Sequence, residues 1–299
     1  QNYPAGPIRI IVPFPAGGGV DTAGRLLGVK LSEAIGRPVL VDNRAGANGM
    51  IGSEMVAKAP KDGYTLMVNG ANFVTSPTLY AKSLYDPIKD FDAISLLAHA
   101  PNILVVHPSM PVKNVRELIA FAKARPGEVL FAGSGSGSTP HLAGELFKTQ
   151  TGTKMVHVPY RGTGPAITAI LSGEVGSMFM PALTALPLIQ SGRVRALGVT
   201  SLERLPALPE LPTVSESGLK GYQSSQWYGV LAPAGTSPEI LNLLNGQTVK
   251  IMQSADMKER MKNSGSVAVG SSREVFAKFL QTEYSKWAQV IKASGATVD

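Results

Sequence analysis

The sequence predicts an α/β protein of two lobes, each built on a parallel β-sheet. Two observations support this fold class: short β-branched segments alternate with helical patterns along the chain, and the same strand–helix series occurs twice. The 299 residues suffice for two domains, and the 44% hydrophobic and 16% charged content is typical of a folded protein. The apolar runs are far shorter than the roughly 18 residues that span a bilayer.

The first copy of the series occupies the N-terminal part of the chain. Isoleucine and valine gather in three predicted strands, at 8–12, 38–43 and 64–69. Apolar residues at helical spacing predict helices over 21–36 and 50–59, with Asp21 as the N-cap of the first. This β-α-β-α-β order requires parallel strands joined by right-handed crossovers.

The second copy repeats this order. Its strands are predicted at 129–133, 154–162 and 176–181, with helices at 141–152 and 165–175. The loop after the second strand reads "NRAGANG" in the first copy and "YRGTGPA" in the second, with Arg44 and Arg161 at equivalent places. Two copies of one architecture predict two α/β lobes. A further strand follows at 193–201.

Two extended segments, 91–109 and 227–235, are predicted to cross between the lobes. Two amphipathic helices, 238–254 and 273–294, complete the chain. We therefore expect residues 1–100 and 224–299 to form the first lobe and residues 101–223 the second. Two crossings make a hinge, and a hinge over a ligand cleft allows the cleft to close.

Composition and motifs exclude several classes of protein. There is no cysteine for thiol chemistry, and His99, His107, His141 and His157 lack metal-ligand spacing, so we expect no metal. The net charge of +7 is scattered, without nucleic-acid motifs, and predicts a solvated basic surface rather than a nucleic-acid partner. Neither GxGxxG, a P-loop nor a G-x-S-x-G elbow occurs, so no cofactor or catalytic residue is predicted.

A glycine-rich loop joins a strand to a helix in each copy: "PFPAGGGVD" at 13–21 and "GSGSGSTPH" at 133–141. Free N–H groups and the positive end of a helix dipole favour anions at such a loop, and glycine lets the main chain approach closely. The alternative is an ordinary tight turn. Because both loops lie at equivalent positions of the repeat, we favour two halves of one anion site.

Several segments resemble the Bug family, the substrate-binding proteins of tripartite tricarboxylate transporters. They include "IRIIVPFPAGGGVDTAGRLL", "VDNRAGANGMIGSEMVAKAPKDGYTL", "GSGSGSTPHLAGELF", "VPYRGTGPA" and "WYGVLAPAGT". The resemblance covers essentially the whole chain. It implies a type II periplasmic-binding-protein (Venus flytrap) fold, a small organic carboxylate ligand, no catalysis, and delivery to membrane transporter subunits or a sensor. We expect a periplasmic monomer; the end "QNYPAGPIRI" is one that a removed signal peptide leaves, as does a recombinant form.

The resemblance implies that the ligand carboxylate binds mainly main-chain amides and waters at the two loops. Asp21 is expected to order its loop rather than touch the anion. For His141, the alternative to ligand contact is a capping or packing role. For Trp227, the alternative is packing at the hinge. The predicted ligand contacts are Phe14, Ala16, Gly17, Gly18, Asn72, Ser76, Ser134, Gly135, Ser136, Ser138, Thr139, His141, Tyr160, Arg161, Met180 and Trp227.

Two positions depart from the family pattern. Gly176 and Met180 stand where members commonly have aspartate. A thioether in place of a carboxylate removes an acceptor for an amino group. We therefore expect a di- or tricarboxylate with an apolar or aromatic middle rather than an amino acid, beside Phe14, Met180 and Trp227. The alternatives are the effector domain of a transcriptional regulator and a cleft hydrolase that uses His141 with a loop serine.

Overall fold

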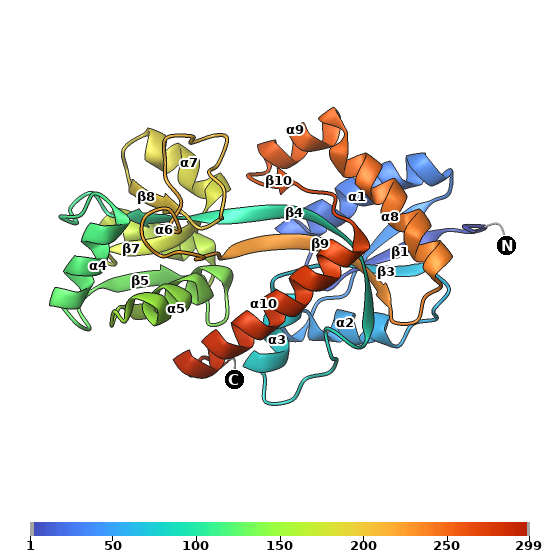
Figure 1. The fold of residues 1–299 in the computed structure, drawn as a ribbon, viewed down its shortest axis with the longest axis horizontal. Coiled ribbons are helices and arrows are strands. Elements are labelled where there is room, and N and C mark those ends of the chain that lie inside the picture. Colours follow the sequence, from blue (N-terminus) through green and yellow to red (C-terminus); the bar gives the residue numbers. More distant parts are fainter. Residues whose placement is uncertain (1–2, 298–299) are drawn as a thin grey trace. The chain divides into compact units, whose positions relative to one another are not determined.

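The computed structural model describes residues 3–297, and the predicted strands and helices occur in it in the predicted order, together with elements that were not predicted (Figure 1). The chain divides into two units. Unit 1 comprises the residues up to His99 together with 227–263 and 267–288. Unit 2 comprises 100–226, 264–266 and the chain from 289 onward. The sequence-based boundaries put residues 264–266 and the chain from 289 onward in the first lobe.

The sheet of unit 1 begins with three parallel strands in the order β2-β1-β3, with β2 at the edge. Ile10 pairs with Val41 on one side and with Leu66 on the other, and fully buried β-branched residues fill this strand. Two longer strands, β9 and β4, follow β3, with β9 antiparallel to it, and β10 pairs with β4. The strands are β1 (Ile8–Val12), β2 (Val39–Asn43), β3 (Thr65–Gly70), β4 (Phe91–Val106), β9 (Ser225–Pro233) and β10 (Val267–Ala268).

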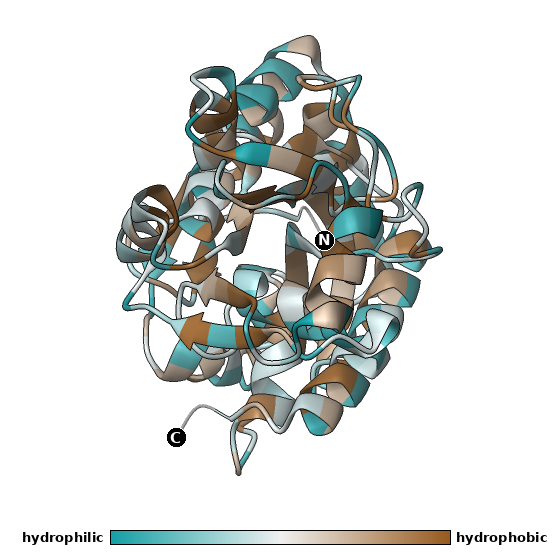
Figure 2. Cartoon of the chain, turned by 90° about the vertical axis from the view of Figure 1, so that its left-hand side faces the viewer, coloured by the Kyte–Doolittle hydropathy of each residue, from teal (hydrophilic) through white to brown (hydrophobic). Residues whose placement is uncertain are grey.

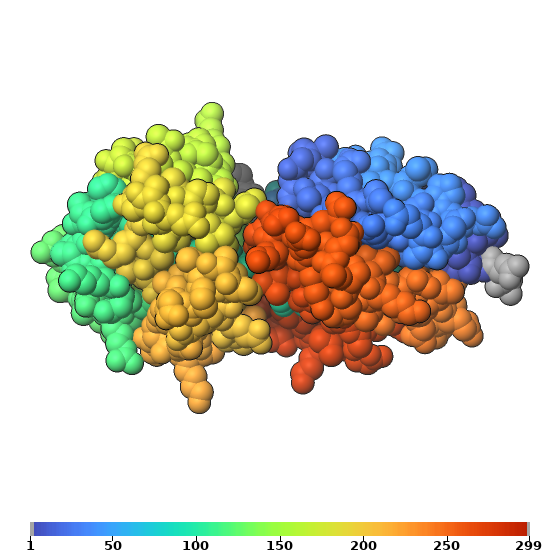
Figure 3. All heavy atoms as spheres, turned by 90° about the horizontal axis from the view of Figure 1, so that it is seen from above, coloured from blue at the N-terminus to red at the C-terminus, as the bar shows by residue number. Residues whose placement is uncertain are grey.

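Helices pack against the strands of unit 1, and along the helices of the protein apolar stretches are interspersed with polar ones (Figure 2). Gly24 lets α1 lie close to the sheet, because a Cβ there would come within 2.9 Å of Val12 Cγ2. Lys30 of α1 pairs with Asp256 of α9 at 3.2 Å, where segments far apart in sequence meet on the surface (Figure 3). The helices are α1 (Gly19–Ile35), η1 (Ala47–Gly49), α2 (Met50–Ala57), α3 (Asn72–Leu79), α8 (Pro238–Gln253), α9 (Ala255–Asn263) and α10 (Arg273–Ser294).

Unit 2 has a mixed sheet in the order β8-β4-β7-β5-β6, in which β5 is parallel to β6 and β7. One face carries an aliphatic core that includes Ile103 and Met180, and the other stacks Phe179 on Tyr222. The elements are α4 (Val115–Ala124), β5 (Leu130–Gly133), α5 (Thr139–Thr151), β6 (Val156–Pro159), α6 (Thr163–Ser172), β7 (Ser177–Pro181), α7 (Ala182–Gln190) and β8 (Arg195–Val199).

One predicted helix start is wrong. Helix α1 begins at Gly19 with Gly18 as its N-cap, so Asp21 lies in the first turn instead of capping it. The carboxylate there reaches back to the preceding loop, and a negative charge in the first turn also suits the helix dipole. As a result, the glycine-rich loop is held from inside the helix that follows it.

Candidate functional site

The loop after β1 presents main-chain donors at the N-terminus of α1. Residues 15–19 are exposed, and Gly17 has a φ of 91°, in the region that favours glycine. The Gly17 N–H donates to Asp21 at 2.9 Å. The N–H groups of Phe14, Ala16 and Gly18 have no acceptor among residues 3–297. Free main-chain donors before a helix N-terminus are the chemistry that favours an anion.

Asp21 orders this loop, as predicted. It is only 3% exposed, and besides the Gly17 N–H it accepts hydrogen bonds from Arg25 Nε at 3.0 Å and Asn43 Nδ2 at 2.9 Å. Burial alone would raise the pKa of Asp21, but the hydrogen bonds from Arg25, Gly17 and Asn43 together lower it. The carboxylate is therefore charged and fully engaged within unit 1.

The side chains of Asn72 and Ser76 both form hydrogen bonds with Asn48, in the segment between β2 and α2. Asn72 Nδ2 donates to Asn48 Oδ1 at 2.8 Å, and Ser76 Oγ donates to the Asn48 carbonyl at 3.1 Å. Asn48 has a positive φ of 53°, uncommon for a non-glycine residue and often found at functional sites. The Phe14 ring packs close to Gly49 of the same loop. Phe14, Asn72 and Ser76 thus lie at one edge of unit 1, but the Ser76 side chain is fully buried.

The loop after β5 is the counterpart in unit 2. The N–H groups of Ser134, Gly135 and Ser136 have no acceptor in the described part of the chain. Ser138 is the N-cap of α5, where its hydroxyl accepts from the His141 N–H at 3.4 Å. Thr139 Oγ1 contacts Gln226 Oε1 at 3.4 Å. As in unit 1, three free N–H groups precede a helix N-terminus.

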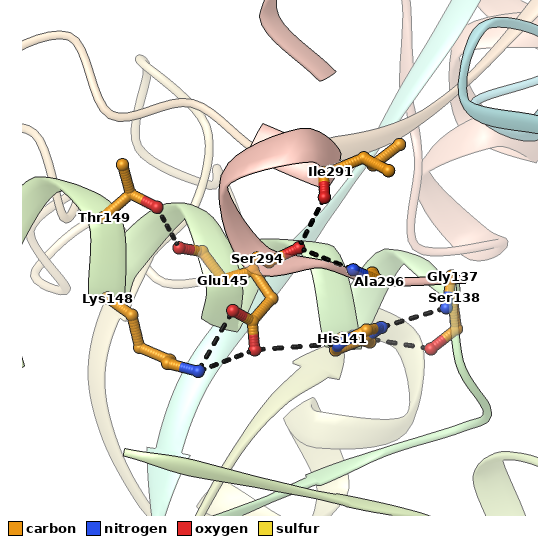
Figure 4. A network of polar contacts seen from close by, with 9 residues as sticks. All are labelled: Gly137, Ser138, His141, Glu145, Lys148, Thr149, Ile291, Ser294 and Ala296. Atoms are coloured by element: carbon orange, nitrogen blue, oxygen red, sulfur yellow. Dashed lines mark hydrogen bonds and ion pairs between the residues drawn. The ribbon is translucent and has the colours of Figure 1, made fainter. Parts of the chain in front are cut away.

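His141 holds this second loop from inside helix α5. Its side chain is 6% exposed, and its Nδ1 accepts from the Gly137 N–H at 2.9 Å (Figure 4). Its Nε2 lies 3.6 Å from Glu145 Oε1. Both ring nitrogens are therefore engaged, and this favours the alternative of a packing role over direct ligand contact.

Tyr160 and Arg161 follow β6, next to the end of β5. The Tyr160 N–H donates to the Gly133 carbonyl at 2.9 Å, which fixes this loop beside the glycine-rich one. The Tyr160 hydroxyl donates to Glu174 at 2.7 Å, and burial together with Glu174 raises its pKa to about 12. Arg161 is exposed and has no ion-pair or hydrogen-bond partner among the described residues, whereas Arg44 pairs with Asp42 at 2.9 Å.

Met180 and Trp227 are both fully buried. Met180 pairs with Ile103 in the sheet and belongs to the aliphatic core of unit 2. Trp227 packs edge-on against Phe276 and Phe279 of α10, with ring centroids 5.8 and 5.6 Å apart. These contacts favour packing roles, so ligand contact by either residue stays a prediction.

Sequence reasoning missed three polar residues near these edges. Asn43 donates both to Asp21 and to the Phe14 carbonyl, so it connects the loop to β2. Asn102 lies beside Pro181 at the end of β7. Asn102 Nδ2 and Ser224 Oγ are buried with no hydrogen-bond partner among residues 3–297, which is uncommon for buried polar atoms. Single asparagines and serines at strand ends carry no sequence pattern that marks them.

Metal-binding clusters and membrane-spanning helices are both absent from residues 3–297. The histidine and carboxylate side chains form no group of three or more that could hold a metal ion. None of the helices is both long and apolar enough to cross a bilayer.

Comparison with known proteins agrees with the sequence motifs. Residues 24–296 match the family described as tripartite tricarboxylate transporter family receptor. Protein BugT of Bordetella pertussis is 38% identical, with 99% of this chain and 91% of BugT covered. A R. palustris structure with adipate has a TM-score of 0.81 at 35% identity, covering 99% of each chain. MatC from Rhodopseudomonas palustris with bound malate has a TM-score of 0.77 at 30% identity, covering 97% of this chain and 100% of MatC. The chain belongs to the tripartite tricarboxylate transporter receptor family, with the type II binding-protein fold that its motifs predict.

Proposed function

We propose that this protein is a periplasmic receptor that binds a small organic carboxylate through loops 13–21 and 133–141, one from each unit. The observation that carries the proposal is the pair of loops itself. Each leaves three main-chain N–H groups without an acceptor in the described chain, directly before a helix N-terminus. Membership of a transporter receptor family supports the same role.

The chemistry of the two loops suits a carboxylate held without a buried salt bridge. Fixed N–H groups and helix dipoles stabilise the negative charge, so no side-chain cation has to be desolvated. Arg161 is exposed and unpaired in the described chain, and in the proposal it adds a positive charge at the rim of the second loop. Asp21 is kept off the ligand by its own hydrogen bonds.

The ligand in this proposal is a dicarboxylate with an apolar middle rather than an amino acid. Met180 occupies a position where the family commonly has aspartate, so an acceptor for an amino group is absent there. The half-buried Phe14 ring lies beside the first loop. Adipate, bound by the similar R. palustris protein, is a ligand of this class. Because Met180 and Trp227 are fully buried, Phe14 is the residue proposed to contact the apolar middle of the ligand.

Titration calorimetry tests the ligand class. We expect adipate or an aromatic dicarboxylate to bind and to raise the melting temperature, since a ligand at about 100 times its Kd stabilises the folded state by about 2.7 kcal/mol. Aspartate and glutamate should bind at least about tenfold more weakly. Tight binding of the amino acids with no binding of dicarboxylates would contradict the ligand assignment.

Two matched cap variants test the role of the second loop. Ser138 and Ser237 are both N-caps of helices that begin with proline at N1 or N2, and both accept a main-chain N–H at 3.4 Å. We expect Ser138→Ala and Ser237→Ala each to lower the free energy of unfolding by about 1 kcal/mol in urea titrations. Only Ser138→Ala should also weaken adipate binding, by about tenfold in calorimetry. Equal affinities of the two variants would argue against the loop as a ligand site.

We further infer that the receptor acts as a monomer, without catalysis, and passes its ligand to membrane transporter subunits or to a sensor. The hydrolase alternative gains no support. No loop serine hydroxyl is hydrogen-bonded to a ring nitrogen of His141 in the described chain, and those nitrogens face Gly137 and Glu145. Membership of the receptor family also favours this role over that of a transcriptional regulator.

A further inference from the structure

The two glycine-rich loops are closed by the same contact made with different chemistry. In each, a glycine with positive φ donates its N–H to the side chain four residues later, at 2.9 Å. Gly17 donates to the carboxylate of Asp21, and Gly137 donates to the imidazole of His141. An ionised carboxylate accepts hydrogen bonds, whereas an imidazole nitrogen accepts only while it is unprotonated.

The surroundings of His141 fix which nitrogen carries its proton. Nε2 faces Glu145, which also pairs with Lys148 at 2.9 Å (Figure 4). Although burial acts to raise the pKa of Glu145, hydrogen bonds from His141 and Lys148 lower it, so Glu145 is a carboxylate. A carboxylate only accepts, so Nε2 carries the hydrogen and Nδ1 keeps its lone pair toward Gly137. The neutral ring thus connects the loop to the ion pair.

Because Nε2 already carries a hydrogen, a second proton on the His141 ring binds to Nδ1. There it would face the Gly137 N–H, and two donors cannot share a hydrogen bond. The peptide before Gly137 must then turn, and with it the free N–H groups of Ser134, Gly135 and Ser136.

The charged and titratable groups packed against the ring come from two elements. Glu145 on α5 favours the charged ring and Lys148 on α5 opposes it. His157 on β6 stacks on His141, with ring centroids 3.8 Å apart and an interplanar angle of 15°. Burial, followed by the proximity of His141, lowers the pKa of His157 to about 4, so His157 remains neutral over most of the range in which histidines titrate.

We propose that His141 is a positioning residue that makes loop 133–141 competent for carboxylate binding only while its Nδ1 is unprotonated, so that acidification releases the ligand. This inference rests on the proposed function. The first loop has no such dependence near neutral pH, since Asp21 stays ionised there. One of the two loops is therefore a pH-sensitive half of the site, and the other is not.

Calorimetric titration with adipate from about pH 8 to about pH 5, the range in which histidine changes charge, tests this proposal. For the wild type we expect constant affinity at the alkaline end and a fall approaching tenfold per pH unit at the acid end. His141→Asn places an amide oxygen near the position of Nδ1 and does not titrate. Whatever its affinity at pH 8, this variant should show only the weaker pH dependence that comes from the ligand's own carboxylates.

Glu145→Gln provides a second, independent measurement. It keeps an acceptor for Nε2 but removes the negative charge that favours the protonated ring, so the fall in affinity should shift to lower pH. A purely structural role for His141 would not move this midpoint, and melting curves verify folding of each variant. Superimposable pH profiles of wild type and His141→Asn would overturn the inference. If the wild type binds no carboxylate even at pH 8, the proposed function itself fails, which is a different outcome.

Discussion

Asp21→Ala is expected to lower the free energy of unfolding by about 3 kcal/mol and the affinity for adipate by at least about tenfold. The Asp21 side chain is 4% exposed, and its carboxylate accepts from three donors, on Gly17, Arg25 and Asn43. Removing it leaves these donors without their acceptor and releases Gly17, so the first loop loses its fixed conformation. Urea unfolding and titration calorimetry measure the two effects.

Asp256→Ala is the matched control. Asp256 accepts from Arg260 Nε at 2.9 Å in the same i,i+4 arrangement as Asp21 and Arg25, but its side chain is 48% exposed. Exposed ion pairs contribute little, so we expect a much smaller loss of stability than for Asp21→Ala, and unchanged ligand affinity. Similar losses for the two variants would show that the buried cluster around Asp21 is not what stabilises the loop.

The stability difference between wild type and Asp21→Ala should also depend on pH. Hydrogen bonds hold the pKa of Asp21 below its ordinary value, so the folded state binds this proton more weakly than the unfolded chain does. The contribution of Asp21 is therefore complete above the unfolded pKa of about 3.9 and is lost as the pH falls through the lower folded pKa. Unfolding curves of the two proteins should converge in strong acid.

The sequence predicted the strands well because short runs rich in β-branched residues reflect burial in the sheet directly. It missed α3 and α7, both of which contain an internal proline, Pro77 and Pro187. Proline disfavours a helix locally, and only packing against the sheet compensates. The segments of α4 and α9 were also left unassigned.

The candidate site could be predicted as loops but not as side chains. Glycine content and position after a strand mark both loops, and the repeat strengthens that argument. The side-chain direction of Met180 could not be deduced, because apolar cores cover both faces of β7 and a buried strand shows no alternation. The stacking of His141 on His157 likewise depends on a residue of a different element, which no local spacing reveals.

Gly133→Ala is expected to lower the free energy of unfolding by about 2 to 3 kcal/mol and to reduce adipate affinity by more than about tenfold. Gly133 ends β5, and a Cβ there would lie 2.1 Å from His157 Nε2. The His157 ring is stacked on His141, so the new methyl group displaces both rings. Movement of His141 in turn breaks the hydrogen bond from Gly137 and disorders the second loop.

Two further variants separate this mechanism from a general effect of replacing glycine. Gly164→Ala, in α6, adds a Cβ with no atom within 4 Å, and we expect it to be neutral or to stabilise the fold by about 0.5 kcal/mol. In the double variant Gly133→Ala/His157→Ala the obstructing ring is absent, so the two single losses should not add, and stability should recover by at least about 1 kcal/mol relative to their sum. Strict additivity would mean that the new Cβ is accommodated without moving His157. The contacts that lead from Gly133 through His157 and His141 to Gly137 would then not control the loop.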